Sequence, residues 1–346
     1  MKAQVLTAFD GPRGFELREV ASPKITRPDQ VRIKVEACGV CHRDITWSRG
    51  KFGTPPLPRV MGHEGAGVVL ETGSAVQQLR PGDRVVHLQF PFCGECEACR
   101  AGRPAACEQV RDAIGECCDG AYAGETVLPA NIVTRIPEGI GFAEASVIAC
   151  TLGTAYHALR LYGFEPQGKT VALNGAGGGV GLQAVGVAKA LGARVIATTT
   201  SPAKADAIRK AGADEVLVDP QARYRKAIGA LTQGRGADLF LEIVGAPTLK
   251  ESLISVRRGG RVVVVGNPEG GSLDFNPGVL ILRGELMMYG TMSMTLPELD
   301  ELLALVAQGK VAPVIDQVVP LAELPAQMQR MEARQSAGRI VVTPGA

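Results

Sequence analysis

Four cysteines close together in the first third of the chain constrain its fold more than any other feature. Cys93, Cys96, Cys99 and Cys107 follow the spacing C-x2-C-x2-C-x7-C. The two-residue gaps let successive thiolates turn toward one ion, and zinc favours four sulfur ligands in a closed tetrahedral site. The alternatives are a disulfide pair, which is rare in a reducing compartment, or a redox dithiol, which needs only two of the four. We therefore expect a structural zinc lobe at about residues 92–108.

A second group of metal-ligand residues is dispersed along the chain. Cys41, His63 and Cys150 offer two thiolates and an imidazole, with Glu64 beside the histidine. Three protein ligands leave one position open, as in catalytic zinc sites. A lone histidine in an apolar setting is more often a packed core residue. Glycines on both sides of His63-Glu64 would let the backbone crowd close to an ion, and Asp44 could accept a hydrogen bond from a ligand imidazole.

The composition is that of an ordinary soluble globular protein. The chain has 346 residues, 46% hydrophobic and 21% charged, with a formal charge of +2 and only 4% aromatic residues. The low net charge provides no basic surface for nucleic acid, and the few aromatic residues provide little for bases to stack on, so we do not expect a nucleic-acid-binding protein. We find no signal peptide and no stretch long enough for a membrane span, so we expect a cytoplasmic protein with no membrane partner.

The hydrophobic pattern changes at Cys150, which predicts two domains. Before it, short segments of period two are separated by glycine and proline, as in a β-rich barrel. After it, strands and helices alternate with short links, as in a doubly wound parallel sheet. The predicted class is α/β. We expect a catalytic domain from residues 1–151 and 291–346, with strand-like alternation from Val311 onward, and a cofactor domain from residues 152–290.

A glycine-rich turn opens the second domain. The strand Thr170–Leu173 runs into Asn174–Gly181 and then a helix at Val180–Leu191. Glycines let the backbone approach a pyrophosphate at a helix N-terminus, where free N–H groups favour anions. The expected contacts are Ala176, Gly178, Gly179, Val180 and Gly181.

The end of the next strand, Arg194–Thr199, predicts which dinucleotide is used. An acidic residue there would favour NAD(H). This chain instead has Thr199, Thr200 and Ser201, with Lys204 nearby. Hydroxyl donors and a cation suit a 2′-phosphate, so we expect NADP(H) rather than NAD(H). Ser201 could also simply cap the helix that begins at Pro202.

These motifs together resemble the zinc-dependent medium-chain dehydrogenase/reductases, the zinc alcohol dehydrogenase family, over essentially the whole chain. Gly62-His63-Glu64-x-x-Gly67-x5-Gly73-x-x-Val76 resembles the zinc signature of that family, and Cys150–Thr154 resembles its third catalytic ligand and the turn that follows. The four-cysteine spacing is similar to its structural-zinc lobe. The resemblance implies a GroES-like catalytic domain and a Rossmann cofactor domain. It also implies that copies of the chain form a homo-oligomer, either a dimer or a tetramer.

The resemblance also implies roles for single residues. It puts a catalytic zinc on Cys41, His63 and Cys150, with Glu64 close to the metal, and so two Zn2+ per chain. It implies cofactor contacts at the pyrophosphate from His42 and Arg339. Contacts beside the nicotinamide are implied for Thr154, Val244, Val265, Gly266 and Asn267.

The departures from the family pattern bear on the chemistry. Alcohol-oxidising members usually have Ser or Thr two residues after the first catalytic cysteine, and often His three residues further on; here these positions are Arg43 and Thr46. Arginine cannot relay a hydroxyl proton. It could hold a carboxylate or phosphate, polarise a carbonyl, or form a structural ion pair with Glu64 or Asp44. The glycine register Ala176-x-Gly178-x-x-Gly181 resembles NADPH-using reductases of the family.

Two enzyme chemistries and one non-enzymatic function remain open. Cys41-His42-Arg43-Asp44 resembles a branch that includes acryloyl-coenzyme A reductases. We therefore expect a small carbonyl, alcohol or enoyl substrate, with either alcohol/aldehyde interconversion or reduction of an α,β-unsaturated carbonyl or thioester. The alternative is a crystallin-like or regulatory protein that binds zinc and NADPH without turnover. The expected pocket residues are Thr46, Trp47, Gln89, Phe90 and Cys117.

Overall fold

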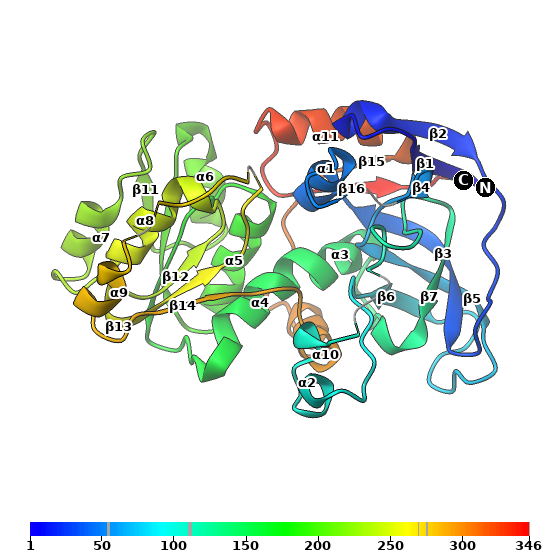
Figure 1. Cartoon of the computed structure of the whole chain (residues 1–346), viewed down its shortest axis with the longest axis horizontal. Helices are drawn as coiled ribbons and strands as arrows, with labels where there is room; N and C mark the ends of the chain where they lie inside the picture. Colours follow the sequence, from blue (N-terminus) through cyan, green and yellow to red (C-terminus); the bar gives the residue numbers. More distant parts are fainter. Residues whose placement is uncertain (54–55, 110–112, 269, 275, 346) are drawn as a thin grey trace. The chain divides into compact units, whose positions relative to one another are not determined.

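The computed structural model describes residues 1–53, 56–109, 113–268, 270–274 and 276–345 and separates into two compact units (Figure 1). The first comprises Met1–Gly153, Ser293–Gly309 and Ile315–Ala346, and the second Thr154–Met292 with Lys310–Val314. We expected 310–314 in the first unit. They group with the second, where Gln183 exchanges two hydrogen bonds with the backbone of Val314, at 2.8 and 3.0 Å.

The first unit is the β-rich domain that the sequence predicts. Its larger sheet has the order β15-β16-β3-β5-β6-β8, with β7 also on β3, and is antiparallel except between β15 and β16. A smaller sheet has the order β2-β1-β4. The strands are β1 Lys2–Leu6, β2 Phe15–Glu19, β3 Gln30–Gly39, β4 Arg59–Val60, β5 Gly65–Thr72, β6 Arg84–His87, β7 Glu125–Pro129, β8 Val133–Arg135, β15 Ile315–Pro320 and β16 Arg339–Thr343.

Short helices and turns fill the links between these strands. The helices are α1 His42–Ser48, α2 Glu97–Arg100, α3 Phe142–Val147, α10 Leu296–Ala307 and α11 Leu324–Glu332. Thr295 begins α10 with a capping box in which Glu298 returns a 2.8 Å hydrogen bond to the Thr295 backbone N–H. The prediction of strand-like structure throughout the C-terminal tail was wrong at α11. Leu324 and Met328 lie one helical turn apart, and both are buried in the core beside β1 and β16.

The second unit is a doubly wound parallel sheet. Its order is β11-β10-β9-β12-β13-β14, and every neighbouring pair is parallel. Helix α5 contacts α6 and α7 contacts α8, and right-handed crossovers place the two pairs on opposite faces. The strands are β9 Thr170–Leu173, β10 Arg194–Thr199, β11 Glu215–Val218, β12 Ala237–Glu242, β13 Val256–Val264 and β14 Met287–Gly290. The helices are α4 Gly153–Arg160, α5 Gly179–Ala190, α6 Ala205–Lys210, α7 Arg225–Leu231, α8 Ala246–Ser255 and α9 Gly278–Leu282.

The core of this sheet explains why its strands are apolar throughout. Strands β9 and β12 are buried along their whole length, as expected when helices cover both faces. The Tyr224 and Phe240 rings stack with centroids 5.4 Å apart, which ties the start of α7 to β12. Among the described residues, no helix is both long and apolar enough to cross a membrane.

Candidate functional site

The four cysteines of the predicted zinc lobe converge on one point. All four Sγ atoms lie within 4.8 Å of one another, and Cys93 Sγ lies 3.6 Å from Cys107 Sγ and 3.9 Å from Cys99 Sγ. Backbone N–H groups point at the sulfurs, including the N–H of Cys96, 3.3 Å from Cys93 Sγ. All four are free thiols.

These separations fit a zinc ion and not a disulfide. A tetrahedral ion with Zn–S bonds of about 2.3 Å holds its sulfurs about 3.8 Å apart, whereas a disulfide needs about 2.05 Å. The N–H groups aimed at sulfur favour the thiolate form that a metal requires. The donor set therefore fits a closed zinc site.

The second group also converges, although its members are far apart in sequence. The ligand atoms of Cys41, His63, Glu64 and Cys150 lie within 4.8 Å of one another, and all belong to the first unit. Cys41 directly precedes α1, and His63-Glu64 directly precedes β5. Cys150 lies in the π-helical turn Ile148–Leu152 that links α3 to α4. Such turns widen the helix locally and recur at functional sites.

Asp44 orients the imidazole of this site. Its Oδ1 lies 3.0 Å from His63 Nδ1, which leaves His63 Nε2 to face the cysteines, 3.8 Å from Cys150 Sγ. The Cys41 backbone N–H and the Tyr122 hydroxyl donate to Asp44 Oδ2 at 3.1 and 2.6 Å. Asp44 is thus where the sequence placed it, whereas Tyr122 was missed because nothing in its local pattern marks it.

The titrating groups of this site are coupled to one another. Burial acts against charge on His63, but the Asp44 carboxylate and Cys41 raise its pKa well above the ordinary value. A hydrogen bond with Cys150 lowers the pKa of Cys41 well below its ordinary value, and Arg339 and His63 add to this effect. The same hydrogen bond, together with burial, raises the pKa of Cys150 well above its ordinary value, so Cys41 is the thiol of this pair that is favoured as a thiolate. A metal that binds all three ligands would displace the protons of His63 and Cys150.

Glu64 and Arg339 form a buried ion pair beside these ligands. Arg339 Nε lies 2.9 Å from Glu64 Oε2, its Nη2 contacts the other carboxylate oxygen, and Nη2 lies 3.8 Å from Cys150 Sγ. Burial raises the pKa of Glu64, and the Arg339 charge opposes this rise. Arg339, which the family resemblance linked to the cofactor pyrophosphate, here neutralises Glu64.

Arg43 has a different partner from the two that the sequence suggested. It forms an ion pair with Glu116, with Nη2 2.9 Å from Oε2, and not with Glu64 or Asp44. Gln89 donates to the same carboxylate at 2.7 Å, and Glu116 is only 2% exposed. Glu116 is 73 residues from Arg43, and no spacing rule links two such positions.

The glycines beside His63 also serve a different purpose from the expected one. Gly62 has φ +95°, and a Cβ there would lie 2.7 Å from the Tyr122 ring. A Cβ on Gly65 would lie 2.6 Å from His87 Nε2, which accepts a hydrogen bond from the Gly65 N–H at 3.1 Å. The absence of a side chain at Gly62 and Gly65 therefore makes room for Tyr122 and His87. This packing accounts for both glycines without an ion beside the backbone.

In the second unit, the glycine-rich turn joins β9 to α5 as expected. A Cβ on Gly181 would lie 2.6 Å from the Ala176 Cα, so the helix start packs directly on the turn. Gly178 precedes the first residue of α5 in extended conformation. The Lys204 side chain covers Gly177, where a Cβ would meet Lys204 Cδ at 2.6 Å. The turn and Lys204 thus lie together at the carboxyl edge of the sheet.

The other residues expected at this edge follow the ends of β10, β12 and β13. Thr199 Oγ1 accepts from the Ser201 N–H at 3.1 Å. Beyond β12, the buried Glu242 accepts from the N–H groups of Val244 and Gly245 at 2.9 and 2.7 Å. Beyond β13, Asn267 Oδ1 accepts from the Ala246 N–H at 3.1 Å. Glu242 thus holds the backbone of the turn after β12. The sequence did not indicate this residue, because nothing in its local pattern distinguishes a buried carboxylate from an exposed one.

Comparison with known proteins agrees with this architecture. Residues 27–138 match the family described as "Alcohol dehydrogenase GroES-like domain", and residues 179–308 match "Zinc-binding dehydrogenase". An acryloyl-coenzyme A reductase from Sulfurisphaera tokodaii is 34% identical over 99% of this chain and 100% of its own length. An alcohol dehydrogenase from Geobacillus stearothermophilus is 35% identical over 99% of this chain and 98% of its own length.

A solved structure shows the same fold over the whole chain. The structure titled "crystal structure of AibC" has a TM-score of 0.93 and 41% identity, and the match covers 100% of this chain and 96% of that one. With the two family models and relatives at more than 30% identity over nearly full length, this chain belongs to the zinc alcohol dehydrogenase family of medium-chain dehydrogenase/reductases, and it is an oxidoreductase.

Proposed function

We propose that this protein is a zinc-dependent, NADP(H)-preferring reductase whose substrates have a carbon–carbon double bond conjugated to a carbonyl, with enoyl thioesters as the main class. The observation that carries the proposal is Arg43. It stands two residues after Cys41, where alcohol-oxidising relatives use a hydroxyl relay, and Glu116 holds it in place.

Arg43 is held in place yet remains reachable. Its guanidinium lies over the rings of Phe52 and Phe90, 5.3 and 5.7 Å from their centroids, and its side chain is 35% exposed. A fixed cation stabilises negative charge that develops on a substrate oxygen, and it needs no reorganisation to do so. Reduction of a conjugated double bond develops such charge on the carbonyl oxygen.

The metal ligands would act on the same oxygen. Cys41, His63 and Cys150 would hold zinc with one position open, and Asp44 would keep His63 in the required tautomer. Zinc bound there supplies a Lewis acid for a carbonyl oxygen.

Alcohol/aldehyde interconversion is the second candidate, because the three ligands suffice for it and a relative is named an alcohol dehydrogenase. The proton relay of that reaction needs a hydroxyl free to pass a proton outward. Thr46 is the one hydroxyl at the expected relay positions, and its Oγ1 donates to the His42 carbonyl at 3.2 Å, inside α1. This bond disfavours Thr46 as a relay and so favours alkene reduction.

The proposed preference for NADP(H) rests on the residues at the end of β10. Thr199, Thr200 and Ser201 replace the acidic residue that would accept from a ribose hydroxyl, and Lys204 lies against the glycine turn. A Ser201→Asp variant should shift the ratio of kcat/KM for NADPH over NADH toward NADH by at least about tenfold, since a carboxylate repels the 2′-phosphate. An unchanged ratio would remove the basis for this preference.

A homo-oligomer is part of the proposal. Strand β14 is the last strand of its sheet, and Met287 and Met288 on it are 40 and 41% exposed. Open strand edges with apolar side chains favour pairing with another chain. Light scattering after size-exclusion chromatography tests this, and a monomer mass would contradict it.

The activity test compares two reactions on one preparation. The proposal predicts a higher kcat/KM for acryloyl-coenzyme A with NADPH than for any primary alcohol with NADP+. Faster alcohol oxidation would favour the second candidate. NADPH binding with no turnover of acyl thioesters, aldehydes or alcohols would favour the non-catalytic alternative.

A further inference from the structure

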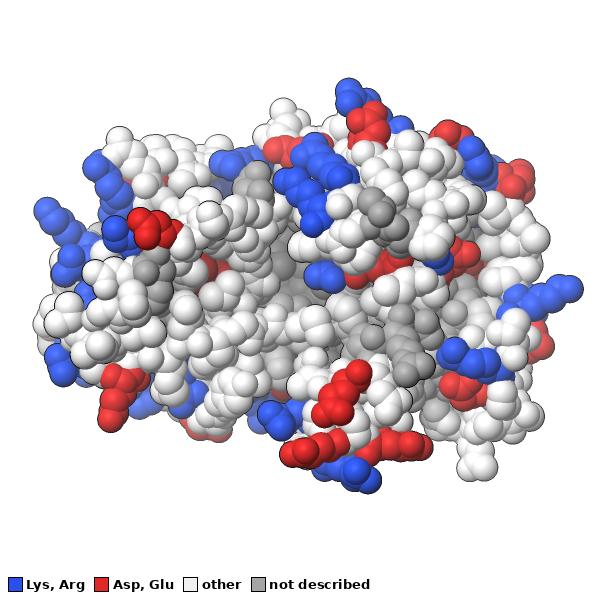
Figure 2. All heavy atoms as spheres, in the orientation of Figure 1, with Lys and Arg blue, Asp and Glu red and all other residues white. Residues whose placement is uncertain are grey.

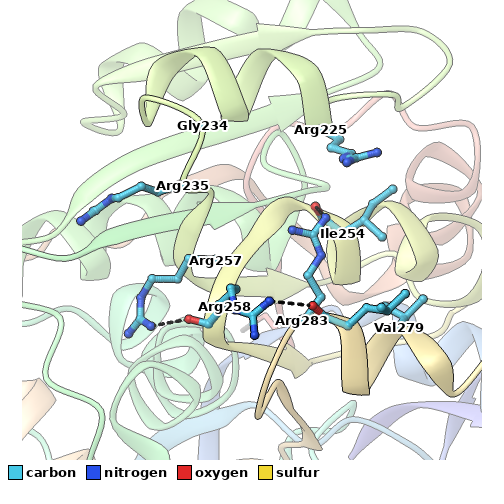
Figure 3. A pocket seen from close by; sticks show the side chains of 9 residues that line it. Arg225, Gly234, Arg235, Ile254, Arg257, Arg258, Val279 and Arg283 are labelled. Atoms are coloured by element: carbon cyan, nitrogen blue, oxygen red, sulfur yellow. Dashed lines mark hydrogen bonds between the residues drawn. The ribbon is translucent and has the colours of Figure 1, made fainter.

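The second unit has an arginine-lined pocket on the opposite edge of the sheet from the glycine turn. Strands β12 and β13 begin beside it, and parallel strands have all their amino ends at one edge. Its volume is about 710 Å³, and it is an open depression of the surface rather than an enclosed cavity. The lining residues are Arg225, Gly234, Arg235, Ile254, Arg257, Arg258, Val279, Leu282 and Arg283 (Figure 3).

The positive charge of this pocket is largely uncompensated. Arg257 pairs with Asp238, with Nε and Oδ1 2.6 Å apart. Among the described residues, no acidic side chain forms an ion pair with the other four arginines, and none lines the pocket; the nearest recorded carboxylate, that of Glu251, accepts from the backbone N–H of Arg225 at 2.8 Å. Burial and the neighbouring charge of Arg225 lower the pKa of Arg283, as expected when like charges face each other without an anion. Figure 2 shows basic side chains gathered over the end of this unit that includes α7 and α9.

Two of these arginines are held in place by backbone carbonyls. Arg283 Nη2 donates to the Ile254 carbonyl at 2.6 Å, and Arg258 Nη1 donates to the Leu282 carbonyl at 3.3 Å. Each guanidinium has five N–H donors, so each keeps donors for a ligand. The side chains of Arg225 and Arg235 form no hydrogen bond with the described part of the chain (Figure 3).

We propose that this pocket binds an organic polyphosphate of the nucleoside polyphosphate class, at a site separate from that of the hydride-donating dinucleotide. Arginine forks match phosphate oxygens in pairs, and four unpaired arginines call for more than one phosphate group. Ile254, Val279 and Leu282 offer apolar contact to the part of the ligand without phosphate. The proposal is independent of the hydride-transfer chemistry.

Fluorescence anisotropy of methylanthraniloyl-ATP tests the proposal on the full-length, zinc-loaded protein. The cofactor site is first saturated with the oxidised dinucleotide, so that only a second site can bind the probe. We expect saturable binding that unlabelled ATP and inorganic tripolyphosphate displace and adenosine does not. No binding, or displacement by adenosine as effective as by ATP, would overturn the proposal.

Variants locate the site. Arg225→Gln combined with Arg235→Gln should weaken probe binding by at least about tenfold, because each removes a charged hydrogen-bond donor. Arg223→Gln combined with Lys226→Gln is the matched control, since it also removes two positive charges, and both residues are exposed on the same segment and do not line the pocket. Equal affinity in the double variant and the wild type would overturn the proposal, as would equal losses in the double variant and the control. Sulfate at matched ionic strength must not reproduce the displacement by tripolyphosphate, or the binding is general charge screening and the proposal fails.

Discussion

Arg43 and Glu116 form an ion pair beside the candidate catalytic metal site, with Nη2 2.9 Å from Oε2. Because Glu116 is buried and also accepts from Gln89, the carboxylate is fixed and sets the direction of the guanidinium. Arg43 is thus anchored rather than free.

Glu116→Gln tests whether this anchoring matters for turnover. The neutral amide keeps the shape but loses the charged hydrogen bonds, so we expect kcat/KM for an enoyl thioester to fall by at least about tenfold. Zinc content should stay the same. Glu125→Gln is a matched control, since Glu125 also pairs with an arginine, Arg32, at 2.8 Å. Equal turnover in the Glu116 variant and the wild type would show that the pair is structural only.

Asp44→Asn should weaken the open metal site and leave the four-cysteine site intact. Losing the carboxylate partner of a ligand histidine typically lowers metal affinity by about 10- to 100-fold. Zinc analysis after dialysis against a mild chelator should therefore give about one zinc fewer per chain. The control is Asp83→Asn, which removes a carboxylate paired with Arg135 in the same unit. Full zinc content in the Asp44 variant would contradict the assigned role.

Cys96→Ser should release the structural zinc. Three thiolates and a hydroxyl bind zinc less tightly than four thiolates, and the short lobe around α2 has little core of its own. We expect zinc content to fall by about one per chain and Tm to drop, with Cys117→Ser, an exposed thiol, as the control. If zinc content and Tm are both unchanged, the lobe does not depend on metal.

His87 should stay neutral far into the acid range. Burial lowers its pKa from 6.5 to about 4. Because the pKa of His87 is lower in the folded state than in the unfolded state, protonation favours the unfolded state. The free energy of unfolding is therefore unaffected by His87 above pH 6.5, and it decreases as the pH falls from there toward 4, by about 3 kcal/mol at most. NMR of 13C-labelled histidine should show one of the four rings titrating near pH 4. Titration of His87 near 6.5 would contradict the burial argument.

The sequence predicted most of the fold and only part of the site. Local features were read correctly: the strand–turn–helix at β9–α5 and the convergence of Cys93–Cys107 both depend on spacing within a few residues. The Glu116 partner of Arg43 was missed because chain folding brings the two together from 73 positions apart. Helix α11 was missed because its apolar residues Leu324 and Met328 are few and follow a strand-like stretch.

The most direct test of the proposed chemistry is the position of hydride delivery. The protein is incubated with NADPH deuterated at the transferred position and cinnamaldehyde, and the product is examined by NMR. Conjugate reduction predicts the saturated aldehyde with deuterium at the β-carbon. Cinnamyl alcohol with deuterium at the carbonyl carbon would contradict the proposal and make this protein an aldehyde reductase in spite of Arg43.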